Sequence, residues 1–480
     1  MPNAASNVDN QSLRSFLDMV ATDHPDDLLR IAQPVDTRFD MTAIVYELER
    51  AGKSPVIIFE RPHPAANGSS ANGMPANGMP VVTNVAGNRK LLAACLGVAV
   101  DDLPAAFRER SQKYIPCELV KDAAWNDVVI EGDDVDLSKL PIPLQFSVDG
   151  GPYITAGQIS ARDPVTGVDT SGFHRLMVKG RNRLGVSLHS RRRMYEFQRR
   201  AEERGQSLPA AVTIGTHPLH YMGSMVYAYP PHVRKFEIIG GLFGEPYRVA
   251  RCSVGEIEVP AGAEIVIEGE ILAETREPEG PFGEFTGYAS YRSTQHVFVA
   301  HRIRMRRDAM FQSVTSGMSR DHILVSCITR EGEILNTLRR NLPNVRAVHV
   351  PHTSCGAFTA YISMKKIADG EPQTAIMAAL GTEFYTKHVI VVDDDVDIFD
   401  TNDVMWAVAT RVRPDKDIFF IPGAKGAILD PTSDPENFTV TKMGIDATRP
   451  AGRDFAERLV IPDDQRARAR ALLGAAGVSF

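Results

Sequence analysis

The spacing of apolar positions changes twice along the chain, and each change marks a different kind of structure. Near the N-terminus, apolar residues recur every three to four positions at 12–21, 41–52 and 89–98, which predicts helices. Between the second and third of these stretches, the run SPVIIFE at 54–60 predicts a buried strand. We therefore expect a small α/β domain at residues 1–129.

After about residue 130, apolar and polar residues alternate in short stretches that Gly, Pro and Asp separate. This pattern predicts a β-rich domain at 130–315, a half-open barrel or sandwich, with one helical insertion at 193–205. Strands and helices then alternate again, which predicts an α/β domain at 316–450. A tail at 451–480 ends in a basic helix, and such tails often dock on a neighbouring subunit. The predicted fold class is therefore a multidomain mixture of α+β and α/β.

Composition narrows the class of protein more than the fold. The chain has 480 residues, of which 43% are hydrophobic and 24% charged, so it is globular and long enough for two or three domains. A net charge of -7 and a pI near 6.0 give no electrostatic reason to expect nucleic acid or an anionic membrane as partner. A small-molecule substrate is the better expectation.

The cysteines and the N-terminus indicate a cytoplasmic protein. All 5 cysteines stand singly, without a CxxC or other ligand spacing, and a chain of this size does not need disulfides. The N-terminus lacks a basic region followed by an apolar core, and no window approaches the roughly 18 apolar residues of a membrane span. Residues 66–80, ANGSSANGMPANGMP, are a low-complexity tract that we expect to form a mobile surface loop.

One short segment, EPEGPFGEFTGY at 277–288, carries two carboxylates on a predicted turn. The Gly-Pro-Phe-Gly sequence between Glu279 and Glu284 breaks the register of a strand and can bring both carboxylates to one pocket. Paired carboxylates perform proton chemistry when their environment separates their pKa values, but an exposed acidic turn explains the segment equally well. Glycoside hydrolysis also uses two carboxylates, but it normally needs aromatic platforms, and the chain has only 2 tryptophans.

Arg175 begins a predicted strand close to Ser171 and His174. An arginine in that position can bind a carboxylate or phosphate through its fork of N–H groups, or it can be a solvated strand end, which is the commoner outcome.

Two further patterns point away from metals. His217 and His220 stand three residues apart, but Pro218 between them argues against a helix and favours a loop or a structural role. The acidic run at 393–400 lacks the Gly and the final Glu of a calcium loop, and we expect it to cap a strand and start a turn.

PEGPFGEFTGY resembles the signature of the UbiD family, reversible decarboxylases that use prenylated FMN. Other segments resemble family landmarks in the same order: VVTNVAGNRKLLAACLG, DLSKLPIPL, DGGPYITAGQISARDPVTG, GFHRLMV, IIGGLFGEP, VPAGAEIVIEGEI, VIVVDDDVDIFDTNDVMWAVATR and KMGIDAT. The resemblance extends from about residue 10 to 450. It implies an N-terminal α/β domain, a central split β-barrel that holds the flavin, and a C-terminal α/β domain that mediates dimerisation.

The resemblance also implies roles for particular residues. Arg175, Glu279 and Glu284 match the network that lies over the flavin in the family. Glu284 would give a proton to the carbon that loses CO2, and Arg175 would position the substrate carboxylate and keep Glu279 ionised. The cofactor would accept the electrons that decarboxylation leaves behind. Lys387 matches a lysine that contacts the cofactor phosphate.

The phosphate end departs from the family pattern. The expected cofactor-binding residues are Thr170, Ser171, Arg175, His189, Lys235 and Lys387. The family holds a divalent metal, Mn2+ or Mg2+, together with K+, and its metal ligands are an Asn, a His and a Glu. Here Thr170 and Lys235 replace the Asn and the Glu, which leaves His189 and counts against the metal. Two hypotheses follow: the Lys235 ammonium takes the place of the metal, or Glu237, on the same strand face, rescues a metal site with His189.

The segment at 316–327 corresponds to a region that lines the family's substrate pocket, so His322 and Cys327 are candidates to contact the substrate ring, although buried structural roles suit both. A histidine suits a ring that bears OH or NH. We therefore expect an aromatic or heteroaromatic acid, of the hydroxybenzoate, indole-, pyrrole- or furan-carboxylate type, with a cinnamic-type acid as the alternative.

The implied partners are the acid, CO2, a flavin prenyltransferase that supplies the cofactor, and a second copy of the chain in a homodimer or higher homo-oligomer. Two other classes stay open. In a flavin oxidoreductase on a split barrel, the carboxylate pair would have no evident task. A non-catalytic flavin-binding subunit would lack part of the set formed by Arg175, Glu279 and Glu284, all of which this chain has.

Overall fold

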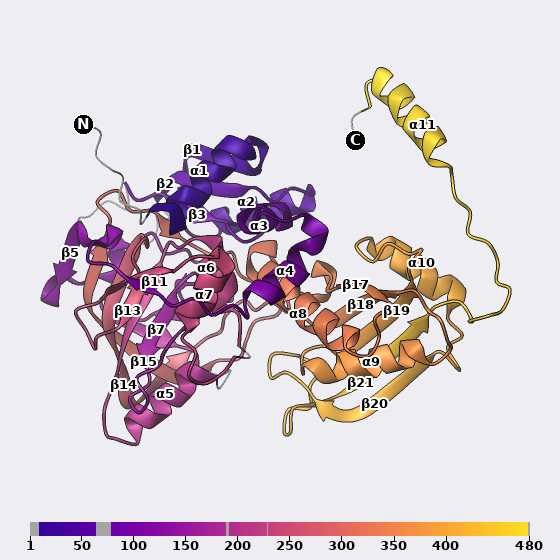
Figure 1. Cartoon of the computed structure of the whole chain (residues 1–480). Helices are drawn as coiled ribbons and strands as arrows, with labels where there is room; N and C mark the ends of the chain where they lie inside the picture. Colours follow the sequence, from indigo (N-terminus) through magenta and orange to yellow (C-terminus); the bar gives the residue numbers. More distant parts are fainter. Residues whose placement is uncertain (1–8, 64–77, 189–191, 228, 479–480) are drawn as a thin grey trace.

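The computed structural model describes residues 9–63, 78–188, 192–227 and 229–478. The tract predicted as a loop at 66–80 therefore lies outside the described residues up to residue 77, and so does His189. Figure 1 shows an N-terminal layer of helices and strands on top of a strongly curled sheet, with a separate α/β layer beside them. The fold is thus the predicted mixture of α and β elements in several domains.

The N-terminal layer confirms the predicted helices and strand. Ser12 caps the first helix through its side chain, and Gly97 ends the third in a left-handed conformation. The helices are α1 (Leu13–Asp23), α2 (Asp40–Arg50), α3 (Arg89–Leu96) and α4 (Leu103–Arg110). The strands, in sheet order, are β1 (Leu28–Asp36), β2 (Val56–His63), β3 (Val81–Thr83) and β16 (Phe311–Gln312). β16 comes from the far end of the central region, so it ties the two regions together.

The central region is built on one large sheet in the order β6-β9-β10-β15-β14-β11-β7-β8, with β5 paired to β15. Its strands are β5 (Val128–Glu131), β6 (Tyr153–Ile154), β7 (Gln158–Arg162), β8 (Asp169–Phe173), β9 (Leu176–Val178), β10 (Arg183–Val186), β11 (Leu208–Ile214), β14 (Ile265–Glu279) and β15 (Ser293–Met305). A smaller sheet contains β4 (Glu118–Leu119), β12 (Arg248–Arg251) and β13 (Glu258–Pro260). The helices are α5 (Arg193–Glu202), α6 (Pro218–Ser224) and α7 (Lys235–Phe243).

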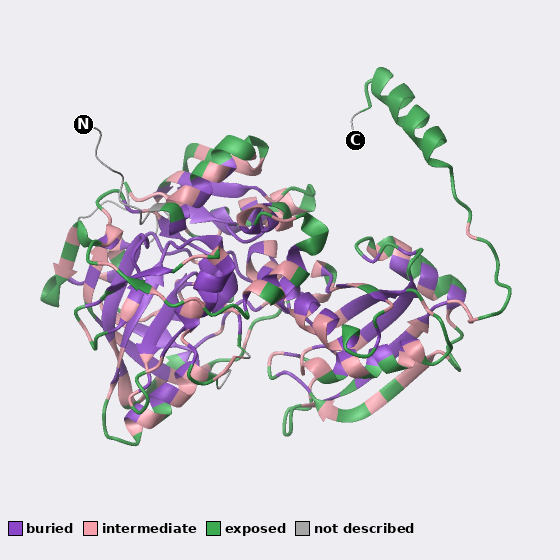
Figure 2. Cartoon of the chain, in the orientation of Figure 1, coloured by how far each residue is buried: buried purple, intermediate pink, exposed green. Residues whose placement is uncertain are grey.

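Connectivity explains why this sheet curls into a half-barrel. β8 lies at one end of the strand order and β9 next to the other end, yet only His174 and Arg175 separate them in the chain. Two residues reach only roughly 10 Å, because each residue spans at most about 3.6 Å, so the two ends of the sheet must approach each other. Much of the sheet is buried (Figure 2), and a large cluster of apolar residues forms its core. Arg175 therefore sits on the seam of the split barrel.

The C-terminal layer has the order β17-β18-β19-β21-β20 with helices on its faces. Its strands are β17 (Val345–His349), β18 (Thr359–Met364), β19 (His388–Asp393), β20 (Ile418–Lys425) and β21 (Thr439–Ala447), and its helices are α8 (Arg320–Arg339), α9 (Glu371–Thr382) and α10 (Thr401–Arg411). As predicted, the acidic run after β19 forms a turn, and Asp400 caps α10.

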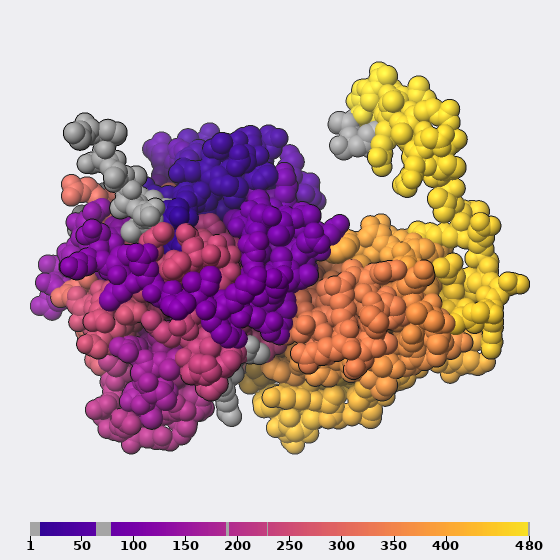
Figure 3. Space-filling view, in the orientation of Figure 1, coloured from indigo at the N-terminus to yellow at the C-terminus, as the bar shows by residue number. Residues whose placement is uncertain are grey.

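The tail ends in helix α11 (Asp463–Ala475), as the basic pattern predicts, and it projects from the body of the molecule (Figure 3). α11 has no buried residue among those described, and Leu459 before it is 98% exposed. Docking of this tail on a neighbouring subunit stays a prediction. In the part of the chain that the structure describes, no helix is long and apolar enough to cross a membrane.

Two local predictions are wrong. Residues 218–224 form helix α6 and not a loop, because proline is tolerated at the first position of a helix, where its missing N–H costs no hydrogen bond. The structural role that the sequence also favoured is confirmed, since His217 caps α6 and His220 is hydrogen-bonded to Tyr247. Lys235 and Glu237 lie at the start of helix α7 and not on a strand, so they do not share a face, because residues two apart on a helix diverge.

Candidate active site

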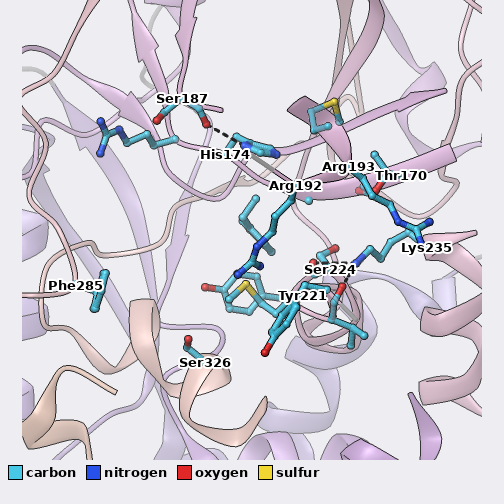
Figure 4. Close-up of a pocket in the computed structure, with 18 of the residues that line it drawn as sticks. Thr170, His174, Ser187, Arg192, Arg193, Tyr221, Ser224, Lys235, Phe285 and Ser326 are labelled. Carbon is cyan, nitrogen blue, oxygen red and sulfur yellow. Dashed lines mark hydrogen bonds between the residues drawn. The ribbon is translucent and has the colours of Figure 1, made fainter. Parts of the chain in front are cut away.

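A cavity of about 720 Å³ lies between the curled sheet and the C-terminal layer, a volume typical of sites for small organic ligands. β8, α5, α6, α7, α8 and the turn after β14 contribute to its walls. Figure 4 shows Thr170, Arg193 and Lys235 gathered in one part of it, with Phe285 in another. The cavity thus has two chemically different ends.

At the first end, Arg175 binds both carboxylates of the predicted turn. Its Nε and Nη2 donate to the two oxygens of Glu279 at 2.9 and 2.7 Å, and its Nη1 donates to Glu284. All three side chains are almost entirely buried, and Arg175 and Glu284 line the cavity. The exposed acidic turn that the sequence left open is therefore not what the chain forms.

The glycines of the turn allow these positions. Glu279 ends β14, and Gly280 follows with φ of +93°, where a side chain would also come within 2.9 Å of the Tyr291 carbonyl. A Cβ on Gly283 would lie 2.4 Å from the Phe146 ring. The chain can therefore reverse tightly enough to aim both carboxylates at one arginine.

Asp149 braces the turn, and sequence reasoning did not single it out. Its Oδ1 accepts from the Gly283 N–H at 2.8 Å and its Oδ2 from the Phe146 N–H at 2.9 Å. The Tyr153 hydroxyl donates to the Pro281 carbonyl at 3.2 Å. The only available signal was the segment DGGPY, which contains both residues.

Electrostatics keep the arginine charged. Burial acts to lower the pKa of Arg175, but its hydrogen bonds to Glu279 and the charges of Glu284 and Glu279 outweigh burial and raise that pKa. Burial lowers the pKa of His322 on α8, and the nearby charge of Glu284 only partly opposes this. The His322 imidazole is therefore neutral at pH 7, and its Nδ1 lies 2.9 Å from the Gly317 carbonyl.

At the second end, positive charge stands without carboxylate partners. Lys235 is 3% exposed, and its Nζ donates to the carbonyls of Ser224, at 3.3 Å, and Val226. Arg192 lies over the Tyr227 ring, 4.5 Å from its centre. Among residues 9–63, 78–188, 192–227 and 229–478, neither cation forms an ion pair with a carboxylate. This end is suited to an anion.

The remaining predicted residues lie as follows. Thr170 and Ser171 on β8 line the cavity, and the Ser171 hydroxyl has no hydrogen-bond partner in the part of the chain that the structure describes. Cys327 is buried in the core of the C-terminal layer and does not line the cavity. Lys387 also lies outside the lining and donates to Asp430 at 2.8 Å, so its contact with a cofactor phosphate stays a prediction.

The geometry around Glu237 and His220 bears on whether the chain holds a divalent metal. Glu237 caps the start of α7 by accepting from the Arg234 N–H at 3.0 Å, and it lines a separate cavity of about 270 Å³. Its expected partner, His189, lies outside the described residues. His220, for which the sequence favours a structural role over metal binding, is hydrogen-bonded to the Tyr247 hydroxyl at 2.9 Å. No cluster of three or more His, Cys, Asp or Glu suited to a metal occurs within the described part of the chain.

A curled barrel with a cation-lined cavity and a buried Arg-Glu-Glu network is the arrangement of an enzyme that binds an anionic ligand and moves a proton. Models of the three domains of 3-octaprenyl-4-hydroxybenzoate carboxy-lyase match residues 21–111 (N-terminal domain), 118–319 (Rift-related domain) and 323–447 (C-terminal domain). The chain belongs to the UbiD family, and it is a carboxy-lyase.

Relatives agree with this assignment. The anhydromevalonate phosphate decarboxylase of Methanothermobacter thermautotrophicus is 33% identical over 91% of this chain and 97% of its own length. The UbiD-class enzyme HmfF of Pelotomaculum thermopropionicum, solved with FMN, is 36% identical with a TM-score of 0.86, covering 95% of this chain and 98% of that one. The 3,4-dihydroxybenzoic acid decarboxylase AroY of Klebsiella pneumoniae is 26% identical with a TM-score of 0.84, covering 96% and 99%.

Proposed function

We propose that this chain removes CO2 from an aromatic or heteroaromatic carboxylic acid, reversibly and without net oxidation, with prenylated FMN as its resident cofactor. The observation that carries the proposal is the single arginine that binds two buried carboxylates at the wall of a cofactor-sized cavity. Such a network has a task in moving a proton, which a flavin oxidoreductase on the same barrel would not need.

The residues present fit the cofactor. Its phosphate would meet Lys235, Thr170 and the unpartnered hydroxyl of Ser171, all at one end of the cavity. When bound, prenylated FMN supplies the electron sink that decarboxylation at an sp2 carbon requires. FMN is present in the solved structure of HmfF, and prenylated FMN in that of an evolved dimeric form of HmfF, which is 34% identical to this chain.

The chain's own residues hold and move the proton. Glu284 reaches the cavity while Glu279 lies behind Arg175, so Glu284 is the carboxyl group that can deliver a proton to the substrate carbon. Arg175 would bind the substrate carboxylate at the start, because a guanidinium pairs with carboxylates through two parallel hydrogen bonds. Glu279 keeps that guanidinium oriented through both of its oxygens.

His322 supports a ring that bears a hydroxyl or N–H group. Its Nδ1 faces the Gly317 carbonyl and so carries the proton, which leaves Nε2 as an acceptor. A ring OH or NH group could donate to that nitrogen, whereas the hydrocarbon ring of a cinnamic-type acid could not.

A second candidate substrate is a phosphorylated unsaturated acid, such as the one named for the anhydromevalonate phosphate decarboxylases. The observation in its favour is Arg192, which lines the cavity and forms no ion pair with a carboxylate of the described chain. With Arg175 assigned to the carboxylate and Lys235 to the cofactor, Arg192 remains for a second anionic group on the substrate.

The test is production of the protein with and without a flavin prenyltransferase, followed by an acid panel monitored for CO2 release. The panel contains 3,4-dihydroxybenzoate, indole-, pyrrole- and furan-carboxylates, cinnamate and anhydromevalonate phosphate. Activity that needs the prenyltransferase supports the cofactor, and activity without it refutes the cofactor. Turnover of the phosphorylated acid alone, weakened by Arg192→Gln, would replace the aromatic acid by the second candidate.

A further inference from the structure

We propose that Lys235 supplies the positive charge that holds the cofactor phosphate, so that this chain binds its flavin without a divalent metal. The inference rests on the proposed flavin site, and it concerns how the phosphate is held rather than which reaction follows.

The position of Lys235 is that of a built-in counter-ion. It is the first residue of α7, and its ammonium lies in the cavity wall, 4.5 Å from the centre of the Tyr229 ring. An ammonium has three N–H groups, and the carbonyls of Ser224 and Val226 accept only two. Burial and the charges of Arg193 and Arg192 lower the pKa of Lys235 well below its usual value. An anion bound beside Lys235 would raise its pKa again, because a neighbouring negative charge favours the charged ammonium.

The same cavity is lined by buried hydroxyl groups whose hydrogen-bonding capacity is not used. Ser171 and Ser224 line the cavity and are only 2% and 8% exposed, yet neither hydroxyl oxygen has a hydrogen-bond partner among residues 9–63, 78–188, 192–227 and 229–478. Within the described residues, the Thr170 hydroxyl has one hydrogen-bond partner, the Tyr229 hydroxyl at 3.4 Å. Buried hydroxyls are normally hydrogen-bonded, so these groups indicate a polar ligand that the cavity is built to receive. Figure 4 shows Thr170, Ser224 and Lys235 close together around the same part of the cavity.

A divalent metal does not fit the same place. The acidic residues of the cavity lining are Asp163, Glu196 and Glu284, and each already binds an arginine: Arg200, Arg199 and Arg175 respectively. A metal ion needs several carboxylate or imidazole ligands that are free to coordinate it. The two imidazoles of the described lining, His174 and His322, belong to no cluster of three or more such ligands in the described part of the chain. In the described part of the wall, six cationic side chains stand against those three carboxylates, so a further divalent cation would enter an already positive wall.

The test measures the affinity for FMN by fluorescence quenching, once in a buffer with EDTA and once in a buffer with Mn2+. The metal content of the flavin-loaded protein is analysed in parallel. We expect wild type to bind FMN equally well in both buffers and to carry no stoichiometric divalent ion. Lys235→Met should weaken FMN binding at least tenfold, Lys235→Arg should keep most of it, and the surface control Lys113→Met should match wild type. Thermal melting establishes that each variant folds.

A complementary double variant should replace phosphate binding by the lysine with phosphate binding through a metal ion. Thr170→Asn with Lys235→Glu puts two of the family's usual ligand types at these positions, so FMN binding should become dependent on Mn2+ and be lost in EDTA. One divalent ion per flavin in wild type, released by EDTA together with the flavin, would overturn the proposal, as would unchanged FMN affinity in Lys235→Met. Failure to decarboxylate with FMN binding intact bears on the proposed function alone.

Discussion

The two ends of the cavity treat charge in opposite ways. At the reactive end, Arg175 already binds two carboxylates before any ligand arrives. At the second, cationic end, Lys235 has no carboxylate partner and the Ser171 hydroxyl has no hydrogen-bond partner among the described residues. The first end is preorganised for proton transfer, whereas the second is completed by its ligand. Substitutions at the two ends should therefore have opposite effects on the stability of the ligand-free protein.

The largest effect is expected for Arg175→Gln, which leaves two buried carboxylates without a cation. Removing one partner of a buried ion pair costs about 3 to 5 kcal/mol, so urea denaturation should show a loss of that order, and CO2 release should stop. Arg175→Lys is the matched variant, because lysine keeps the positive charge but lacks the planar guanidinium that binds a carboxylate through two N–H groups. It should be more stable than Arg175→Gln and equally inactive. An active Arg175→Lys enzyme would contradict the role given to the two-pronged contact.

Asp149→Asn tests the brace behind the reactive end. One side-chain oxygen becomes an NH2 group, so either the Gly283 or the Phe146 N–H loses its acceptor. The cost of such a buried, unmade hydrogen bond is about 1 to 3 kcal/mol, and we expect kcat to fall by about one to two orders of magnitude while FMN still binds. In a Glu284→Gln background the same change should have no further effect on turnover. An additive loss would mean that Asp149 acts elsewhere.

The burial of Lys235 should make the stability of the ligand-free protein depend on pH. Because the pKa of Lys235 is lowered in the folded protein, the unfolded chain binds more protons below pH 10.5. The stability of the ligand-free protein should therefore rise with pH through the window that ends at 10.5, by at most about 1.4 kcal/mol per pH unit from this group. Lys235→Met should lack that contribution and be more stable at neutral pH. Equal pH slopes for the two proteins in denaturation experiments would show that the ammonium is not desolvated.

The smallest effect is expected at the contact between the Glu284 turn and the C-terminal layer. The Phe285 ring lies 5.9 Å, centre to centre, from the rings of both Phe358 and Tyr385. Aromatic pairs contribute about 0.5 to 1.5 kcal/mol each, so Phe285→Ala should lower kcat/KM several-fold without abolishing it. Tyr291→Ala, in the same segment but 93% exposed, is the control and should behave as wild type in the same assay.

The sequence pattern predicted the helices of the N-terminal layer and the strands of the barrel. The buried face of a helix repeats about every 3.6 residues and that of a strand every 2 residues, so both leave a periodic pattern of apolar residues. The resemblance of EPEGPFGEFTGY to a family signature located Glu279 and Glu284. Neither source could reveal that Asp149, more than a hundred residues away, holds Gly283, since hydrogen bonds across such separations leave no periodic trace. The sequence predicts a strand at the start of α7, whereas the fold forms a helix there, because the contact between Glu237 and the Arg234 N–H caps it.

The most direct test of the account measures where the proton comes from. The protein, produced together with a flavin prenyltransferase, is given its acid substrate in D2O, and deuterium in the product is followed by mass spectrometry. We predict one deuterium at the carbon that lost CO2, and a loss of CO2 release and deuterium incorporation of about 100-fold or more in Glu284→Gln with flavin still bound. Glu277→Gln, which removes a carboxylate that pairs with Lys179 and Arg183 outside the network, should match wild type. Full incorporation by Glu284→Gln would contradict the assignment of Glu284 as proton donor.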